Sequence, residues 1–168
     1  MRVLGIDPGS RVTGWGVVEA RGTALCHVAS GTIVLAATEP LEARFARLHA
    51  ACRELVAAWA PAAAVLERAF VARNVQSAFR LGEARGAVLA AIGASGTPLH
   101  QYAPAAVKLA AVGDGRADKD AVGRGVALRL GLAGRLSTDA ADALALALCH
   151  LQQAPLLARV GAALGRIR

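Results

Sequence analysis

The order of strand-like and helix-like segments limits the fold of this chain more than any other feature of the sequence. Three strand-like segments come first, helical and strand-like segments then alternate, and helices come last. The strand-like segments are residues 2–7, 12–18, 24–35, 62–70 and 98–102. The helical segments are residues 41–59, 74–94, 104–112, 119–130 and 138–151. This order is typical of the α/β class and predicts a mixed five-stranded sheet flanked by helices.

The length of the chain, 168 residues, is typical of one domain. We expect this domain to span residues 1–154 and residues 155–168 to form a basic C-terminal tail. No apolar run reaches the roughly 18 residues that a membrane span needs. Asp7 interrupts the N-terminus before the apolar core of a signal peptide develops. The sequence therefore predicts a cytoplasmic protein with no membrane partner.

The charge of the chain is concentrated in its middle. The formal net charge is +7, and residues 68–135 hold ten Lys and Arg against four acidic residues. Residues 1–67 are balanced, with six of each sign. An excess gathered in one segment favours a basic face, and nucleic acid is the commonest partner of such a face.

Four carboxylates come from three distant segments that the predicted topology brings together. Asp7 ends the first strand, and Glu67 stands near the end of the fourth. A right-handed crossover makes these two strands parallel neighbours, so both side chains lie at one edge of the sheet. Asp139 and Asp142 are three residues apart and share one face of the last helix.

Each carboxylate also has an ordinary structural explanation. Asp7 precedes Pro8-Gly9 and is suited to capping a turn. Glu67 has an ion-pair partner available in Arg68 or another arginine. Asp139 is suited to the N-cap of the last helix, with Asp142 as its reciprocal partner. The four acids have no catalytic or metal-binding role only if all of these explanations are correct at once.

Clustered carboxylates repel one another unless a cation compensates their charge. Oxygen ligands of this kind suit Mg²⁺ or Mn²⁺, and a pair of such ions can hold both the attacking and the leaving oxygen of a phosphodiester. The acid cluster beside a basic segment therefore predicts a nuclease or phosphoryl-transfer site.

Several motifs resemble those of the RuvC family of Holliday-junction resolvases, in the order that the family has them. They are Gly5-Ile6-Asp7-Pro8-Gly9-Ser10-Arg11-Val12-Thr13-Gly14, Glu67-Arg68-Ala69-Phe70 with Arg73-Asn74, Ala84-Arg85-Gly86, Val107-Lys108 leading to Gly113-Asp114-Gly115, and Asp139-Ala140-Ala141-Asp142-Ala143-Leu144-Ala145. The resemblance covers nearly the whole chain. It implies a ribonuclease-H-like fold and paired symmetric nicks in two opposed strands of a four-way DNA junction.

The resemblance also implies roles for individual residues. The matching positions make Asp7, Glu67, Asp139 and Asp142 the ligands of Mg²⁺, two ions per site, with Mn²⁺ as a substitute. Phe70 matches an aromatic residue that stacks on an unpaired base near the junction centre. The other residues expected to contact DNA are Arg73, Asn74, Arg80, Lys108 and Lys119.

The implied partners are a second copy of the chain and the branch-migration proteins RuvA and RuvB. The helix that begins near Asn74 resembles the family's dimer helix, and its Gly82 and Gly86 lie on one face. Three rival functions stay open at this point. They are a nuclease of the same fold that acts on RNA, one half of an actin-like ATPase, and a DNA-binding module without catalysis.

Overall fold

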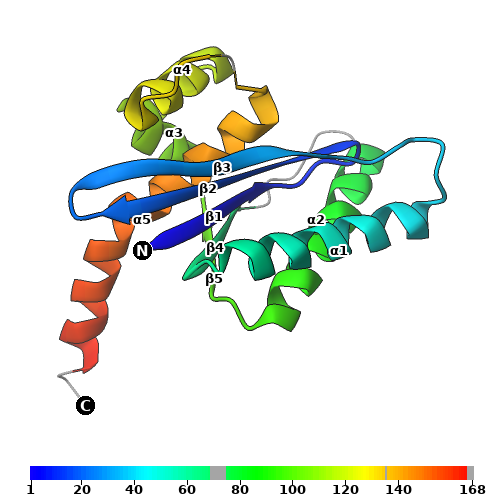
Figure 1. Ribbon diagram of the computed structural model, residues 1–168, viewed down its shortest axis with the longest axis horizontal. Coiled ribbons are helices and arrows are strands. Elements are labelled where there is room, and N and C mark those ends of the chain that lie inside the picture. Colours follow the sequence, from blue (N-terminus) through cyan, green and yellow to red (C-terminus); the bar gives the residue numbers. More distant parts are fainter. Residues whose placement is uncertain (69–74, 135, 166–168) are drawn as a thin grey trace.

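The computed structural model describes residues 1–68, 75–134 and 136–165 of the chain (Figure 1). Within these ranges the chain forms five strands and five helices. The strands are β1 (Arg2–Asp7), β2 (Val12–Arg21), β3 (Ala24–Val34), β4 (Ala63–Glu67) and β5 (Leu99–Tyr102). The helices are α1 (Leu41–Trp59), α2 (Val75–Ser95), α3 (Pro104–Val112), α4 (Lys119–Leu130) and α5 (Thr138–Gly165).

The five strands form one mixed sheet in the order β3-β2-β1-β4-β5. The first three strands are antiparallel neighbours, and β1, β4 and β5 are parallel neighbours. The predicted five-stranded mixed sheet is therefore confirmed, and so is the parallel placement of the fourth strand beside the first. This placement decides where the carboxylates lie.

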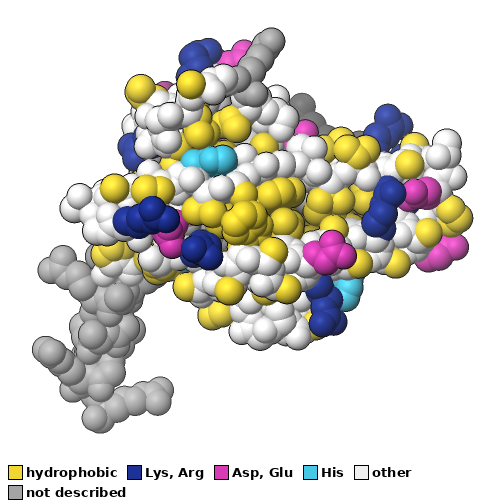
Figure 2. Space-filling view, viewed as in Figure 1, with side chains coloured by type: hydrophobic (Ala, Val, Ile, Leu, Met, Phe, Trp, Pro, Cys, Tyr) yellow, Lys and Arg dark blue, Asp and Glu magenta, His cyan; other side chains and the backbone are white. Residues whose placement is uncertain are grey.

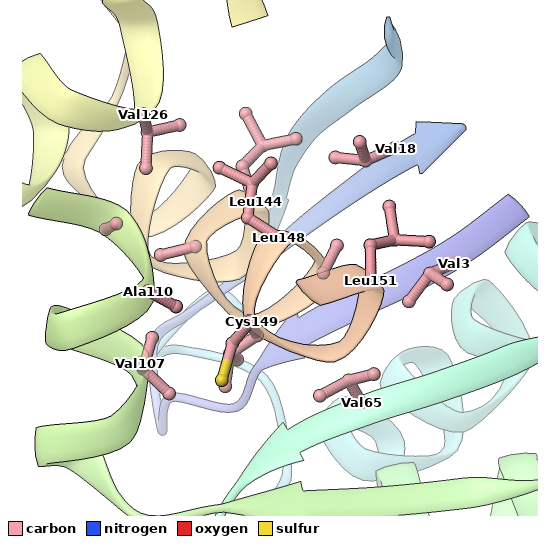
Figure 3. Close-up of a cluster of buried hydrophobic side chains, with 14 of the residues drawn as sticks. Val3, Val18, Val65, Val107, Ala110, Val126, Leu144, Leu148, Cys149 and Leu151 are labelled. Carbon is pink, nitrogen blue, oxygen red and sulfur yellow. The ribbon is translucent and has the colours of Figure 1, made fainter. Parts of the chain in front are cut away.

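One face of the sheet is covered by α3, α4 and α5. Figure 3 shows this core, in which Val3, Val18 and Val65 of three strands lie near Leu144 and Leu148 of α5. All five side chains are fully buried. Burying a side chain of this size stabilises the fold by about 1.5–3 kcal/mol relative to leaving it in water. α5 is thus fixed against the middle of the sheet.

The opposite face of the sheet is covered by α1 and α2. Leu4 and Leu66 project from neighbouring strands into this second core, where they join Leu48 of α1 and Val88 of α2. Leu4 follows Val3 directly and faces the other way, as the two-residue period of a strand requires. A sheet buried on both faces holds the ends of β1 and β4 in fixed positions.

The last helix is longer than the sequence analysis predicted. α5 continues through Pro155 to Gly165, whereas the pattern predicted a helix ending at Leu151 and a tail from residue 155. Proline removes one backbone hydrogen bond and crowds the preceding turn, but it does not always end a helix. The flanking Ala- and Leu-rich sequence favours helix on both sides of it. Residues 155–165 are therefore helical, and Figure 1 shows this part of α5 extending away from the body of the molecule.

The surface carries apolar as well as charged side chains. Figure 2 shows hydrophobic side chains gathered across the middle of one face, with charged side chains around them. Even so, no helix in the described part of the chain is long and apolar enough to cross a membrane.

Candidate active site

Asp7 and Glu67 lie side by side at one edge of the sheet. Ile6 of β1 is paired with Leu66 of β4 in the parallel register, and each strand ends at the next residue. Parallel neighbours present their carboxyl ends at the same edge, where open α/β sheets commonly bind ligands. The two carboxylates thus occupy the position that the sequence predicted for them.

The start of α5 reaches the same edge because two glycines allow a close approach. Gly14 of β2 is paired with Asp7, and a Cβ atom on Gly14 would overlap the backbone carbonyl of Asp139. A Cβ atom on Gly5 would likewise overlap the backbone carbonyl of Ala143. This close approach places the start of α5, with Asp139 and Asp142, directly over the end of β1.

Other residues perform the structural roles that could have explained the carboxylates. Thr13 holds the turn after β1, since its hydroxyl donates to the carbonyl of Gly9 and accepts from the same residue's N–H. Ser137 caps α5, because its Oγ accepts from the backbone N–H of Ala140 at 3.3 Å. Asp139 is therefore not the N-cap. No ion pair joins Glu67 to a cation within the described residues.

Three of the four carboxylates line one cavity of about 230 Å³. Asp7, Glu67 and Asp142 share its wall with Lys108 and Lys119. The Lys119 ammonium lies 3.3 Å from Oδ2 of Asp142. Asp118, which directly precedes Lys119, caps α4 by accepting from the N–H of Ala121 at 2.7 Å. The cavity therefore brings three carboxylates together with two lysines.

Burial and mutual repulsion raise the pKa of the acids in this cavity. Burial raises the pKa of Asp7 to about 7, and the charges of Asp142, Glu67 and Asp139 add to the effect while Lys119 opposes it. Burial and Asp142 also raise the pKa of Glu67. Asp142 in turn raises the pKa of Lys119. Asp7 is thus poised between its charged and neutral forms near neutral pH, and added positive charge would favour the charged form.

The donor set fits a hard divalent cation. Asp7, Glu67, Asp139 and Asp142 offer carboxylate oxygens, which Mg²⁺ and Mn²⁺ prefer. Among residues 1–68, 75–134 and 136–165, no three acidic, His or Cys side chains are already gathered at the spacing of a formed metal site. The repulsion that raises the pKa of Asp7 is what a bound cation would relieve. These four side chains are the residues that could hold a metal.

The peptide that follows Glu67 is fixed at both of its ends. Nη1 of Arg85, on α2, donates to the backbone carbonyl of Glu67 at 2.6 Å, and its Nη2 donates to Oε1 of Gln101 at 2.7 Å. The N–H of Arg68, on the same peptide, donates to the carbonyl of Tyr102 at 2.7 Å. Arg85 therefore holds the backbone of Glu67 where the chain leaves the sheet.

A comparison with known families decides where this site belongs. A family model described as the crossover junction endodeoxyribonuclease RuvC matches residues 3–150. The chain belongs to the RuvC family. The resemblance drawn from the motifs is thereby confirmed. Membership of this family implies a divalent-metal-dependent nuclease.

Individual RuvC proteins match almost the whole chain. The RuvC of Alkalilimnicola ehrlichii is 51% identical over 159 residues, which cover 95% of this chain and 96% of the relative. The RuvC of Rhodospirillum rubrum is 45% identical over 150 residues and 89% of each chain. The structure of Thermus thermophilus RuvC in complex with a Holliday junction superimposes with a TM-score of 0.87 at 36% identity, covering 93% of this chain and 96% of that one.

More distant structures agree on the fold. The yeast mitochondrial Holliday junction resolvase Ydc2 superimposes with a TM-score of 0.65 at 16% identity, over 88% of this chain and 77% of that one. The ribonuclease-H-like fold predicted for the chain is confirmed by these matches and by the mixed sheet with helices on both faces.

The expected DNA contacts of this RuvC protein fall into three groups. Lys108 and Lys119 line the acidic cavity. Arg80 instead lines a different and larger cavity, between α1 and α2. Phe70, Arg73 and Asn74 lie outside the described residues. The first group alone is thus placed beside the carboxylates.

Sequence reasoning missed the role of Arg85 in this RuvC site. Arg85 belongs to one of the motifs that resemble the RuvC family, but its position in the sequence does not predict a contact with Glu67, which is 18 residues earlier. The only local signal is an arginine on the buried side of a helix, next to the fully buried Ala84. A charged side chain in that position needs partners, and backbone carbonyls at a strand end are suitable ones.

Replacing Arg85 with methionine is expected to weaken divalent-cation binding about 10- to 100-fold, the usual cost of losing an outer-shell partner of a metal ligand. Methionine keeps an apolar stem but leaves the carbonyl of Glu67 without its donor. Titration calorimetry with Mn²⁺ measures the effect directly. Arg53→Met, an exposed change on α1, is the matched control and should bind Mn²⁺ as the wild type does. A lower Tm with unchanged Mn²⁺ affinity would contradict the prediction.

Proposed function

We propose that this protein resolves four-way (Holliday) DNA junctions in recombination and repair by paired symmetric nicks. It acts as a divalent-metal-dependent endonuclease, and the ligands of its metal are Asp7, Glu67, Asp139 and Asp142. The observation that carries the proposal is the cavity that Asp7, Glu67 and Asp142 line together with Lys108 and Lys119. Acids and cations around one cavity match a bound metal and an anionic substrate.

Each of the four carboxylates and both lysines has its own part in hydrolysis of the phosphodiester. Two Mg²⁺ ions, for which Mn²⁺ can substitute, would supply an activated water and stabilise the leaving oxygen when bound. Asp7 and Glu67 hold ligand oxygens at a fixed separation because the sheet register fixes their strands. Asp139 and Asp142 supply oxygens from the opposite side, on the first turns of α5. The ammonium groups of Lys108 and Lys119 attract the scissile phosphate.

The remaining contacts with DNA are assigned to the expected residues. Arg80 contacts the phosphate backbone, and Arg73 and Asn74 do so on the segment before α2. Phe70 stacks on an unpaired base near the junction centre, since stacking on one ring tolerates any base. The basic excess of residues 68–135 covers these positions and both lysines.

Paired nicks require two active sites, and we assign α2 to the homodimer interface. Val75 and Phe79 are 68% and 69% exposed on this helix. Gly82 and Gly86 continue the same face, and a Cβ atom on either would meet nothing within 4 Å. An open face of apolar and small residues suits close packing against the same face of a second copy.

The change Gly86→Glu is expected to raise the dissociation constant of the dimer at least about 100-fold, since an unpaired charge buried in an interface costs about 3–5 kcal/mol. The isolated chain should still fold, because the space around Gly86 is open and Gly is a poor helix former. Sedimentation velocity measures the oligomeric state. Ala57→Glu, which adds the same charge to an exposed position of α1, is the control. A dimeric Gly86→Glu variant would refute the assignment of α2.

In the cell the dimer works in the cytoplasm with the branch-migration proteins RuvA and RuvB, which move the junction. This part of the proposal depends on the family alone. Pull-down of the purified chain with RuvA and RuvB on a four-way junction tests it.

Mapped cleavage of a synthetic four-way junction tests the proposed function as a whole. We expect two nicks at symmetric positions in opposed strands when Mg²⁺ is present, and none in EDTA. Plain duplex of the same sequence should stay intact. Equal cleavage of duplex and junction, or faster cleavage of an RNA junction, would overturn the proposal in favour of another nuclease of this fold.

A further inference from the structure

A basic notch lies between the N-terminal ends of α1 and α2, outside the acidic cavity. It has a volume of about 480 Å³, larger than the 230 Å³ of the acidic cavity. Arginines from three separate segments line it: Arg11 from the turn after β1, Arg44 from α1 and Arg80 from α2. Only Arg80 had been expected to bind DNA.

The charges of this notch are largely uncompensated. None of the ion pairs found among the described residues involves Arg11, Arg44 or Arg80. Glu83 is the one acidic residue among those that line the notch, so arginines outnumber acids three to one. Arg11 and Arg80 are exposed to solvent. Three arginines and a single acid around one cavity suit an anionic ligand.

Arg44 has a structural part as well. One of its guanidinium nitrogens donates to the backbone carbonyl of Ser10. This hydrogen bond ties α1 to the turn that carries Arg11, and both residues line the notch. A contact within the fold therefore holds one wall of the notch, between α1 and the turn after β1.

The notch and the metal-binding carboxylates are separated by one short turn. Asp7 and Arg11 are four residues apart, so their Cα atoms lie within about 14 Å of each other. Each nucleotide of one DNA strand advances about 3.4 Å along the helix axis. DNA held at the carboxylates therefore has backbone phosphates within reach of the notch, no more than about four nucleotides away.

We propose that this notch binds one backbone phosphate of the junction DNA, with Arg11 and Arg80 as its donors and Arg44 as the residue that holds the turn in place. The proposal rests on the proposed function and adds a second anchor for the substrate. Planar guanidinium groups bind phosphate oxygens in pairs, so two of them around one phosphate fix its position as well as its charge.

The test measures binding of a four-way junction in EDTA over a range of salt concentrations. Each phosphate contact contributes about 0.9 to the slope of log K against log salt. We expect Arg11→Met and Arg80→Met each to weaken binding about 5- to 10-fold. The double variant should lower the slope by about 0.9, because the two side chains share one phosphate. Arg53→Met, an exposed change further along α1, should leave the slope as it is.

Three results would overturn this assignment. An unchanged slope in the double variant would mean that DNA does not enter the notch. A loss of about 1.8 would mean that Arg11 and Arg80 contact two different phosphates. A free mononucleotide could instead raise the Tm of the wild type but not that of the double variant, while the salt dependence of junction binding is the same for both. That result would make the notch a nucleotide site. Wild-type protein that binds junction no better than duplex would instead refute the proposed function itself.

Discussion

Replacing Asp7 with asparagine is expected to slow junction cleavage at least about a thousandfold, while junction binding persists. Asp7 ends β1 between Glu67 of β4 and the start of α5, so it lies close to the carboxylates of both elements. Loss of one ligand oxygen removes about 4 kcal/mol or more of metal-dependent stabilisation of the transition state. Binding should be equal or tighter, because one negative charge beside the phosphate is gone. Single-turnover cleavage at saturating protein separates the two effects.

Glu54→Gln provides the control for the loss of one acid. Glu54 is exposed on α1, and its replacement should leave the rate of cleavage unchanged. EDTA should reduce the wild type to the level of the Asp7→Asn variant, and Mn²⁺ should restore the wild type alone. Cleavage by Asp7→Asn within about tenfold of the wild type would remove Asp7 from the metal site.

The carboxylate site was predictable because short-range patterns and one topological rule determine it. Asp7 and Glu67 each end an apolar strand, and the right-handed crossover makes these strands parallel neighbours. The i, i+3 spacing of Asp139 and Asp142 puts them on one helix face. Gly14 lies within a strand, where a glycine favours close approach of another backbone, and the carbonyl of Asp139 is the group that approaches it.

Features that depend on how the helices pack against distant segments were not predictable. The hydrogen bond of Arg85 to Glu67 requires knowledge of which side of α2 faces β4. The notch of Arg11, Arg44 and Arg80 requires the ends of α1 and α2 to be neighbours. The length of α5 was not predictable from Pro155, because helix-forming residues on both sides of it continue the helix.

The faces of α2 show how several parts of the mechanism meet on one helix. Arg85 points to the end of β4, Arg80 lines the notch beside α1, and Gly82 and Gly86 lie on the open face assigned to the partner subunit. Movement of α2 would therefore disturb the backbone of Glu67, the second phosphate site and the dimer together. On this view dimerisation and metal binding are linked through Arg85, and Gly86→Glu should also weaken Mn²⁺ binding.

The stability of the metal-free protein is expected to fall as the pH rises from about 4 to 7. Asp7 has a pKa of about 7 in the folded chain against 3.8 as the ordinary value, so between these limits the folded state holds a proton that the unfolded state has lost. Stability falls with pH wherever the folded state binds more protons. This difference between the folded and unfolded pKa of Asp7 lowers the free energy of unfolding by at most about 4 kcal/mol.

Asp7→Asn should remove most of this pH dependence. Asparagine cannot ionise, so we expect the metal-free variant to melt several degrees higher than the wild type at pH 8, since each kcal/mol is worth roughly 2–4 °C in a domain of this size. At pH 4 the two proteins should melt at similar temperatures. Mg²⁺ should raise the Tm of the wild type at pH 8 and barely affect the variant, because a bound cation stabilises only a folded state that can hold it. Scanning calorimetry at both pH values, with and without Mg²⁺, measures these melting temperatures. A variant that melts lower than the wild type at pH 8 without metal would mean that Asp7 stabilises the turn after β1 more than its charge destabilises the site.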